Sequence, residues 1–175
     1  MSAKQGNCRN KIRIQRLCLY GILCALCLVI GFIENFINLS FIAPGVKIGL
    51  SNSVALILAA KGDIKGAFCV NITRILLSTL LFGSPFSLLF SITGGIASLC
   101  VMALLSKSKS VSIIGISTAA GAVHNIFQLL VALAVLGGGM LWYLPLLIVV
   151  GAVSGAVVGI FSLFILKKVE TNQFF

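Results

Sequence analysis

The sequence predicts an all-helical integral membrane protein, built as a bundle of six transmembrane helices. The mean hydropathy is +1.18, 59% of the 175 residues are apolar and only 9% are charged. A soluble domain of this length needs far more polar surface than this composition provides. The apolar residues also fall into runs that approach the roughly 20 residues a helix needs to cross a bilayer. One membrane domain is therefore expected.

Charged turns and Gly/Pro breakers separate the apolar runs and set the limits of the expected helices. A basic segment, residues 1–16, precedes the membrane domain, residues 17–168, and a short tail, residues 169–175, follows it. A basic start before an apolar run also fits a signal peptide, but this run is too long and no clear cleavage pattern follows it. The six expected spans are residues 17–37, 46–60, 66–82, 86–105, 111–136 and 143–166.

The basic residues predict the orientation of these spans. Eleven of the 13 Lys and Arg residues lie in the N-terminal segment, in the turns at 61–65 and 106–110, and just after the last span. The alternate loops at 38–45, 83–85 and 137–142 carry none. By the positive-inside rule, the N- and C-termini are both expected in the cytoplasm of a bacterial cell, with the chain crossing the plasma membrane several times. A five-span arrangement would place later basic turns outside.

Several function classes are disfavoured by the same sequence. The net charge of +10 sits between apolar runs, which is typical of orientation signals and headgroup contacts, and there is no nucleic-acid-binding pattern. Cys24 and Cys27 form a CxxC inside an apolar run without a second pair at metal-site spacing, so they are expected to be small buried residues. His124 is the single histidine, and its helix carries no carboxylate. No metal, cofactor or catalytic residue is expected.

Polar side chains inside the expected spans require an explanation, because an unpaired charge in a bilayer costs several kcal/mol. Counting along each helix at about 1.5 Å per residue places most of them in the outer half of the membrane. Arg74 lies near the middle of its span, and its long side chain can reach the same level. These residues predict a small polar pocket on the outer side. The predicted ligand-binding residues are Glu34, Lys47, Asn52, Arg74, His124, Asn125 and Gln128.

Each of these residues also has a structural interpretation. Glu34 and Lys47 could pair with each other at headgroup level. Asn52 could hydrogen-bond a neighbouring helix. Arg74 could belong to a structural ion pair or cap backbone carbonyls. His124 shares a helix face with Gln128 at i,i+4, so with Asn125 these side chains could hold helices together.

Small residues at four-residue spacing predict close helix contacts. Gly151, Gly155 and Gly159 form such a ridge on the last span, and Gly21 with Ala25 form a shorter one on the first. Either ridge could pack inside the bundle or form a docking face for a partner subunit. Internal packing is favoured for the last span.

Four stretches of the chain form a recognisable set: PGVKIGLSN at 44–52, RILLS with LFGS at 74–84, FSLLFSITGG at 86–95 and HNIFQL at 124–129. They resemble one bacterial membrane family, named Gx transporter or heptaprenyl diphosphate synthase component I. The resemblance extends from about residue 44 to residue 168. By its overall organisation the family is similar to the S components of energy-coupling-factor vitamin transporters. Those are six-helix proteins that take a small ligand from outside and dock on a shared transmembrane subunit driven by two ATPases.

The resemblance implies a membrane substrate-binding subunit of a small-molecule importer. Its partners would be the lipid bilayer, an unidentified ligand, and a coupling subunit with ATPases, since this chain has no GxxxxGK[ST] motif of its own. Lys47 and Arg74 favour an anionic or carbonyl-rich ligand, and residues 38–45 are expected to form a lid.

The synthase name implies an alternative, an accessory membrane subunit in prenyl diphosphate or quinone metabolism. Prenyl chain elongation needs aspartate-rich clusters that hold Mg²⁺ on diphosphates. Asp63 is the only aspartate in the chain, so the chain is not expected to be the catalyst. A third interpretation is a structural scaffold, in which the polar residues pair internally and leave no cavity.

Overall fold

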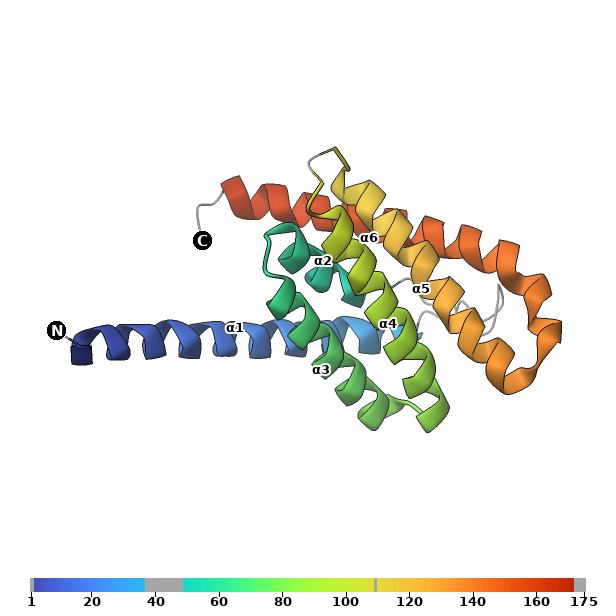
Figure 1. Cartoon of the computed structure of the whole chain (residues 1–175), viewed down its shortest axis with the longest axis horizontal. Helices are drawn as coiled ribbons and strands as arrows, with labels where there is room; N and C mark the ends of the chain where they lie inside the picture. Colours follow the sequence, from blue (N-terminus) through green and yellow to red (C-terminus); the bar gives the residue numbers. More distant parts are fainter. Residues whose placement is uncertain (1, 37–48, 109, 172–175) are drawn as a thin grey trace.

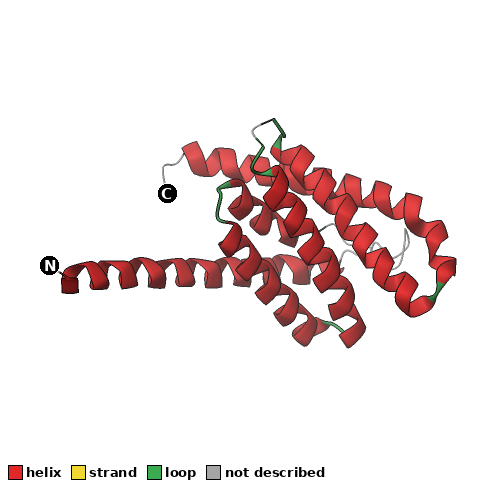
Figure 2. Ribbon diagram, viewed as in Figure 1, coloured by secondary structure: helices red, strands yellow, loops and turns green. Residues whose placement is uncertain are grey.

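The computed structural model describes residues 2–36, 49–108 and 110–171, and in these ranges it contains helices and turns but no strand (Figure 2). The predicted all-helical fold class is confirmed for this part of the chain. The elements in chain order are α1 (Ser2–Phe36), η1 (Leu50–Asn52), α2 (Ser53–Ala60), α3 (Ile64–Phe82), α4 (Pro85–Leu105), α5 (Ile113–Leu136), η2 (Gly138–Tyr143) and α6 (Leu144–Thr171).

The helices form one bundle around the short helix α2. Helix α5 packs along both α4 and α6, and α3 packs against α4 and α1. Helix α2 contacts α3, α4 and α6. The C-terminal half of α1 joins the bundle, whereas its N-terminal half extends beyond it (Figure 1).

In the described ranges, five helices are long and apolar enough to cross a membrane, so the chain is a multi-pass membrane protein. The expected span at 46–60 is not among these candidate spans. Its first residues lie outside the described ranges, and the remainder forms the short apolar segment Leu50–Ala60, which is about 16 Å long. The count of six spans stays a prediction. The five candidate spans are Asn10–Glu34, Ile64–Phe82, Pro85–Leu105, Ile113–Val135 and Gly138–Val169.

Helix α1 is longer than the span expected at 17–37. It is one helix of 35 residues, about 52 Å in length, and it includes the basic segment that was expected to be separate. The physical reason is that residues 2–16 contain no proline and several good helix formers, so the helix continues where the apolar run ends.

Helix α2 is the buried centre of the bundle. Six of its eight residues are buried, and Leu56 is only 1% exposed. A helix that is apolar on all sides is typical of a position inside a protein or a membrane. Because α3, α4 and α6 all contact it, α2 acts as a core around which the longer helices pack.

The turn between α2 and α3 is closed by backbone hydrogen bonds. The Asp63 amide donates to the Leu58 carbonyl at 2.9 Å, and the Gly62 amide donates to the Ala59 carbonyl at 3.0 Å. Gly62 has φ +82°, the left-handed conformation that glycine adopts without a steric penalty. Together these features form a Schellman motif that ends α2.

Asp63 then joins this turn to α1. Its Oδ1 accepts a hydrogen bond from the Gly66 amide at 3.0 Å, which caps the start of α3. Its Oδ2 accepts a hydrogen bond from the Tyr20 hydroxyl at 2.5 Å. The bond from Tyr20 holds the pKa of the Asp63 carboxyl below its usual range, although partial burial opposes this. One carboxylate therefore fixes the relative positions of α1, α2 and α3.

The described turns differ in charge at the two ends of the bundle. The α2–α3 turn, the α4–α5 turn and the last residues of α6 lie at one end, here named the basic end (Figure 1). It carries Lys61, Lys65, Lys107, Lys167 and Lys168. The α3–α4 turn and η2 lie at the opposite end, named the neutral end, and hold no Lys or Arg.

The glycine ridge of α6 packs inside the molecule, against α5. A Cβ atom on Gly155 would lie 2.4 Å from the Ser117 carbonyl oxygen, and one on Gly151 would lie 2.6 Å from that of Gly121. The two backbones therefore meet with no room for side chains. The shorter ridge on α1 has a different environment, since Gly21 and Ala25 are both exposed.

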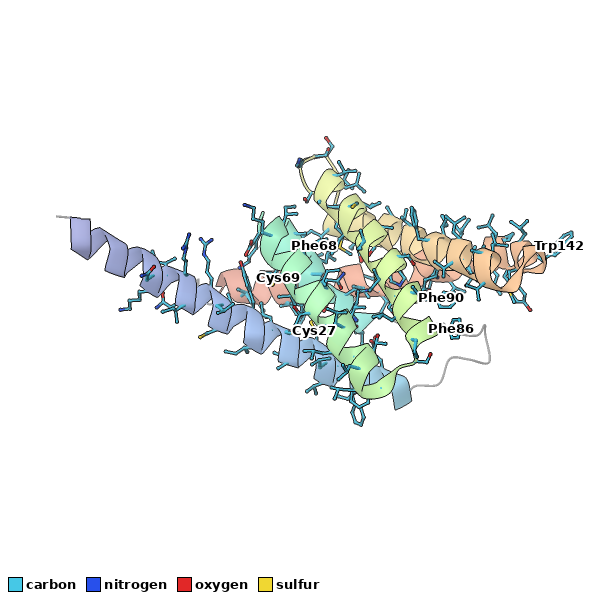
Figure 3. All side chains as sticks on the ribbon, turned by 60° about the horizontal axis from the view of Figure 1, so that its bottom comes forward. Cys27, Phe68, Cys69, Phe86, Phe90 and Trp142 are labelled. Carbon is cyan, nitrogen blue, oxygen red and sulfur yellow. The ribbon has the colours of Figure 1, made fainter. Side chains whose placement is uncertain are left out.

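Apolar side chains cover much of the outer surface. Phe68 is 48% exposed, Phe86 61% and Trp142 90%, and all three stand on the outside of the bundle (Figure 3). Lipid tails can cover such a surface, whereas water cannot do so without a large cost.

Candidate ligand-binding cavity

A cavity of about 550 Å³ lies between the helices. Residues of α1, η1, α3, α4, α5, η2 and α6 line it. Binding sites for small molecules have volumes of roughly 300–1,000 Å³, so the cavity is large enough for such a ligand. Its presence disfavours a purely structural scaffold without a cavity.

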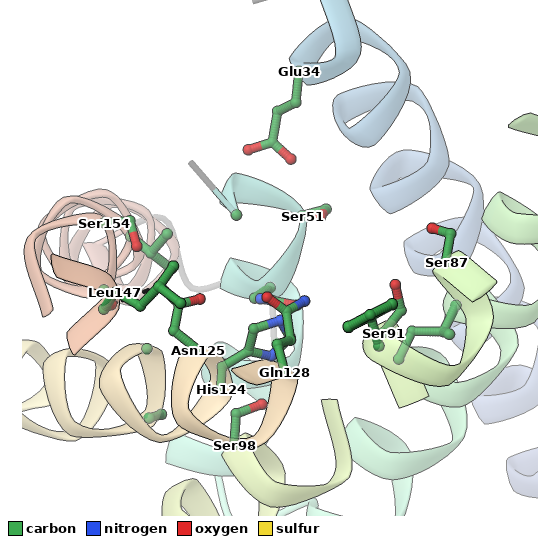
Figure 4. A pocket seen from close by; sticks show the side chains of 18 of the residues that line it. Glu34, Ser51, Ser87, Ser91, Ser98, His124, Asn125, Gln128, Leu147 and Ser154 are labelled. Atoms are coloured by element: carbon green, nitrogen blue, oxygen red, sulfur yellow. Dashed lines mark hydrogen bonds between the residues drawn. The ribbon is translucent and has the colours of Figure 1, made fainter. Parts of the chain in front are cut away.

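Six of the seven predicted binding residues line this one cavity (Figure 4). The seventh, Lys47, lies outside the described residues. The helix rotations, which the sequence left open, thus bring together side chains from α1, η1, α3 and α5. Their role in binding a ligand stays a prediction. The six residues are Glu34, Asn52, Arg74, His124, Asn125 and Gln128.

The guanidinium of Arg74 is the central charged group of the cavity wall. Its Nη1 donates to Ser51 Oγ at 2.9 Å, and its Nη2 donates to Asn52 Oδ1 at 2.9 Å and to Asn71 Oδ1 at 3.0 Å. All three acceptors are neutral oxygens. The Nε atom is buried and has no hydrogen-bond partner. Among the described residues, Arg74 is therefore held by dipoles and not by a carboxylate.

Asn71 extends this network to α4. Its Nδ2 atom donates to the Gly95 carbonyl at 3.4 Å. Arg74 and Asn71 lie three residues apart on α3, so they share one helix face. The network thus links η1, α3 and α4 beside the cavity. Ser51 and Asn71 were not among the predicted binding residues, because their contacts depend on how the helices pack.

Glu34 lines the cavity from the C-terminal end of α1. Its side chain is buried, and Oε1 accepts a hydrogen bond from the Leu50 amide at 2.5 Å. The first amides of a helix have no partner within it and carry a partial positive charge. Glu34 therefore caps η1 while it lines the cavity, so it lies inside the protein; the predicted pairing with Lys47 falls outside the described residues.

His124 and Gln128 line the cavity from the same face of α5, as their spacing predicts. The His124 ring packs against Gly94 of α4, where a Cβ atom would lie 2.9 Å from His124 Cε1. The His124 Nδ1 atom is buried without a hydrogen-bond partner. Asn125 has a packing role in addition, because its Nδ2 donates to the Leu147 carbonyl of α6 at 2.9 Å.

Serine side chains supply most of the remaining polar lining. The sequence did not single them out, because serine is also a common small residue where membrane helices pack. A signal was present on α4, where Ser87, Ser91 and Ser98 share a face at spacings of four and seven residues. The lining serines are Ser51, Ser78, Ser87, Ser91, Ser98, Ser117 and Ser154.

The cavity is elongated along the bundle. Phe82, Gly83 and Tyr143 line it at the neutral end, and Met102 with Val158 line it deepest toward the basic end. From Ser87 to Met102, the lining residues of α4 span about 22 Å. The cavity therefore reaches the neutral end and stops short of the basic end.

The family model described as Heptaprenyl diphosphate synthase component I matches residues 23–165, which include α2 to α5 and every described residue that lines the cavity. No curated protein and no solved structure matches the chain.

Proposed function

The chain belongs to the heptaprenyl diphosphate synthase component I family, and from this premise we propose that it is the membrane substrate-binding subunit of a small-molecule importer. In this proposal it resembles an energy-coupling-factor S component in the bacterial plasma membrane. It binds a small anionic molecule in the 550 Å³ cavity.

The observation that supports this proposal is the state of Arg74. A buried charge without a directly paired counter-ion is costly in a bilayer, and all three acceptors of Arg74 are neutral. Glu34 lines the same cavity and attracts Arg74, but it accepts its hydrogen bond from the Leu50 amide. A carboxylate or phosphate of a ligand would supply a negative charge in direct contact with the guanidinium. Guanidinium groups bind such anions through paired hydrogen bonds, and Nε–H is one donor that remains to be used.

The side of entry follows from the charges of the turns. The cavity reaches the neutral end, which lacks Lys and Arg in its described turns. The positive-inside rule assigns that end to the outer side of the membrane. The ligand then enters from outside, and the basic end faces the cytoplasm. Energy would come from a transmembrane coupling subunit with ATPases.

The alternative is an accessory subunit in prenyl diphosphate or quinone metabolism, which the family name favours. Serines in the inner half of the cavity, Ser98, Ser117 and Ser154, favour a polar ligand over a long prenyl chain, although apolar side chains make up much of the wall. In both proposals the subunit is not the catalyst. Its one aspartate, Asp63, lies at the basic end and is engaged by Tyr20 and Gly66.

Thermal unfolding of the purified protein in mild detergent tests the proposal. Small carboxylates and phosphates are compared with farnesyl diphosphate as stabilising ligands, and native mass spectrometry reports any ligand that co-purifies. We expect a small anion to stabilise the protein, and Arg74→Ala and His124→Ala to reduce that effect at least tenfold. Lys65→Gln, which removes a positive charge at the basic end, is the control.

Two results would contradict the proposal. If Arg74→Ala and His124→Ala stay folded and bind as the wild type does, the cavity is not the binding site. If farnesyl diphosphate alone stabilises the protein, and a soluble prenyl synthase co-purifies in place of ATPases, the accessory role holds instead.

A further inference from the structure

A second cavity, shallow and largely open to the surroundings, lies at the basic end, beside the turn between α2 and α3. Its volume is about 350 Å³, and it shares no lining residue with the larger cavity. The inference drawn from it is independent of the proposed function. Its lining residues are Arg16, Leu19, Tyr20, Lys61, Gly62 and Asp63.

The charges of this second cavity favour an anion. Arg16 and Lys61 bring two positive charges, and Asp63 brings one negative charge. Both oxygens of Asp63 already accept hydrogen bonds, one from the Tyr20 hydroxyl and one from the Gly66 amide. The carboxylate is thus occupied within the protein, and the lining keeps a net positive charge.

The cavity lies where the surface of α1 changes from basic to apolar. Lys11 and Arg13 precede it along the helix, and apolar residues follow it. Leu19, Leu23 and Leu26 lie on the side of α1 that also carries Arg16, and Leu26 is 50% exposed. A molecule in the cavity could thus place a charged group beside Arg16 and an apolar chain along these leucines.

We propose that this second cavity binds the phosphate group of an acidic phospholipid. Basic pockets between membrane helices on the cytoplasmic side bind lipid headgroups of this kind. Arginine and lysine supply charge-assisted hydrogen bonds to phosphate oxygens. The lipid would contact α1 and the α2–α3 turn together, at the point where Tyr20 and Asp63 already join them.

Native mass spectrometry of the full chain tests this inference. The protein, extracted in mild detergent, is titrated with phosphatidylglycerol and, separately, with phosphatidylcholine. The test variant is Arg16→Gln with Lys61→Gln. The matched control is Lys107→Gln with Lys168→Gln, which removes the same charge from exposed residues of the basic end that line neither cavity. All four residues are exposed, so neither variant removes buried packing.

We expect the wild type to retain one phosphatidylglycerol in preference to phosphatidylcholine. The test variant is expected to lose on the order of tenfold in affinity, since each basic residue contributes about 1 kcal/mol to such binding. The control variant is expected to bind as the wild type does. Equal losses in the two variants would show general attraction by the basic end, and no lipid preference in the wild type would overturn the proposal outright. Displacement of the lipid by millimolar inorganic phosphate would assign the cavity to free phosphate.

Discussion

Arg74 on α3 donates a hydrogen bond from Nη2 to Oδ1 of Asn52 on η1, and the two atoms lie 2.9 Å apart. The bond joins residues 22 positions apart in the sequence and fixes the charged group beside the cavity. Because Asn52 is neutral, it orients the guanidinium without cancelling its charge. A carboxylate at the same place would hold Arg74 equally well but remove the charge that a ligand needs.

Asn52→Asp is therefore expected to weaken ligand binding without destabilising the fold. The new carboxylate neutralises Arg74, so the variant should unfold at the wild-type temperature or above while its affinity for an anionic ligand falls more than tenfold. Asn52→Ala instead leaves a donor of Arg74 unpaired, which should cost about 1–3 kcal/mol of stability. Thermal unfolding with and without ligand measures both effects. Wild-type affinity in Asn52→Asp would show that the charge of Arg74 is not used for binding.

Gly155→Ala is expected to disrupt the contact between α5 and α6. The added Cβ would lie 2.4 Å from the Ser117 carbonyl oxygen, and overpacking of this kind costs about 1–3 kcal/mol or more. Gly21→Ala is the control, since nothing lies within 4 Å of its added Cβ. The unfolding temperature in detergent should fall for the first variant and not for the second. Equal unfolding temperatures for the two variants would mean that α5 and α6 accommodate the added methyl group without loss of stability.

The bond between Tyr20 and Asp63 predicts a dependence of stability on pH. The pKa of Asp63 is lowered in the folded protein, chiefly by the hydrogen bond from Tyr20. The ionised carboxylate therefore stabilises the fold above its unfolded pKa of about 3.9, and this contribution is lost as the pH falls through the lower, folded pKa.

Tyr20→Phe removes the main cause of that lowered pKa. It should cost about 1 kcal/mol at pH 7, and the difference from the wild type should shrink as the pH falls below about 4. Unfolding temperatures measured across this range provide the test, with Tyr143→Phe as the control. A constant difference at every pH would indicate that Tyr20 acts through packing alone.

Cysteine labelling tests the orientation and the number of spans. In a variant whose native cysteines are replaced by alanine, Gly138→Cys should react with an impermeant maleimide added to intact cells. Lys11→Cys, Ser108→Cys and Lys168→Cys should react only after permeabilisation, because the basic end is expected in the cytoplasm. Labelling of Lys11→Cys and Lys168→Cys from opposite sides would mean an odd number of crossings.

Local signals in the sequence were sufficient to locate most helix ends. Ser84 accepts a hydrogen bond from the Ser87 amide and Pro85 occupies the first turn of α4, as the Gly-Ser-Pro stretch suggests. Gly137, with φ +90°, follows the end of α5. Hydrophobicity predicted where the first span lies but not the secondary structure of the basic segment before it, through which α1 continues.

The cavity could be predicted in outline but not in its contacts. Residue counting placed Glu34, Asn52 and His124 at similar depths, and the structure gives all three to one cavity. The acceptors of Arg74 could not be predicted. A hydrogen bond such as that to Ser51 requires the two atoms to be placed within a few tenths of an ångström, and the rotation of each helix sets those positions. Lys47, which the sequence placed beside them, lies outside the described residues.

The uninterrupted course of α1 has a mechanical consequence. Glu34 contacts η1 near one end of the helix, Tyr20 rests on the α2–α3 turn in its middle, and the basic residues lie beyond that support. The helix can therefore be treated as a rigid rod that rotates about Tyr20. The arm of this rod from Ser2 to Tyr20 is about 27 Å long. A rotation of about 10° around Tyr20 would displace the tip by about 5 Å. The arm from Tyr20 to Glu34 is about 21 Å long, so a displacement at the cavity end would reach the N-terminal tip enlarged only about 1.3-fold.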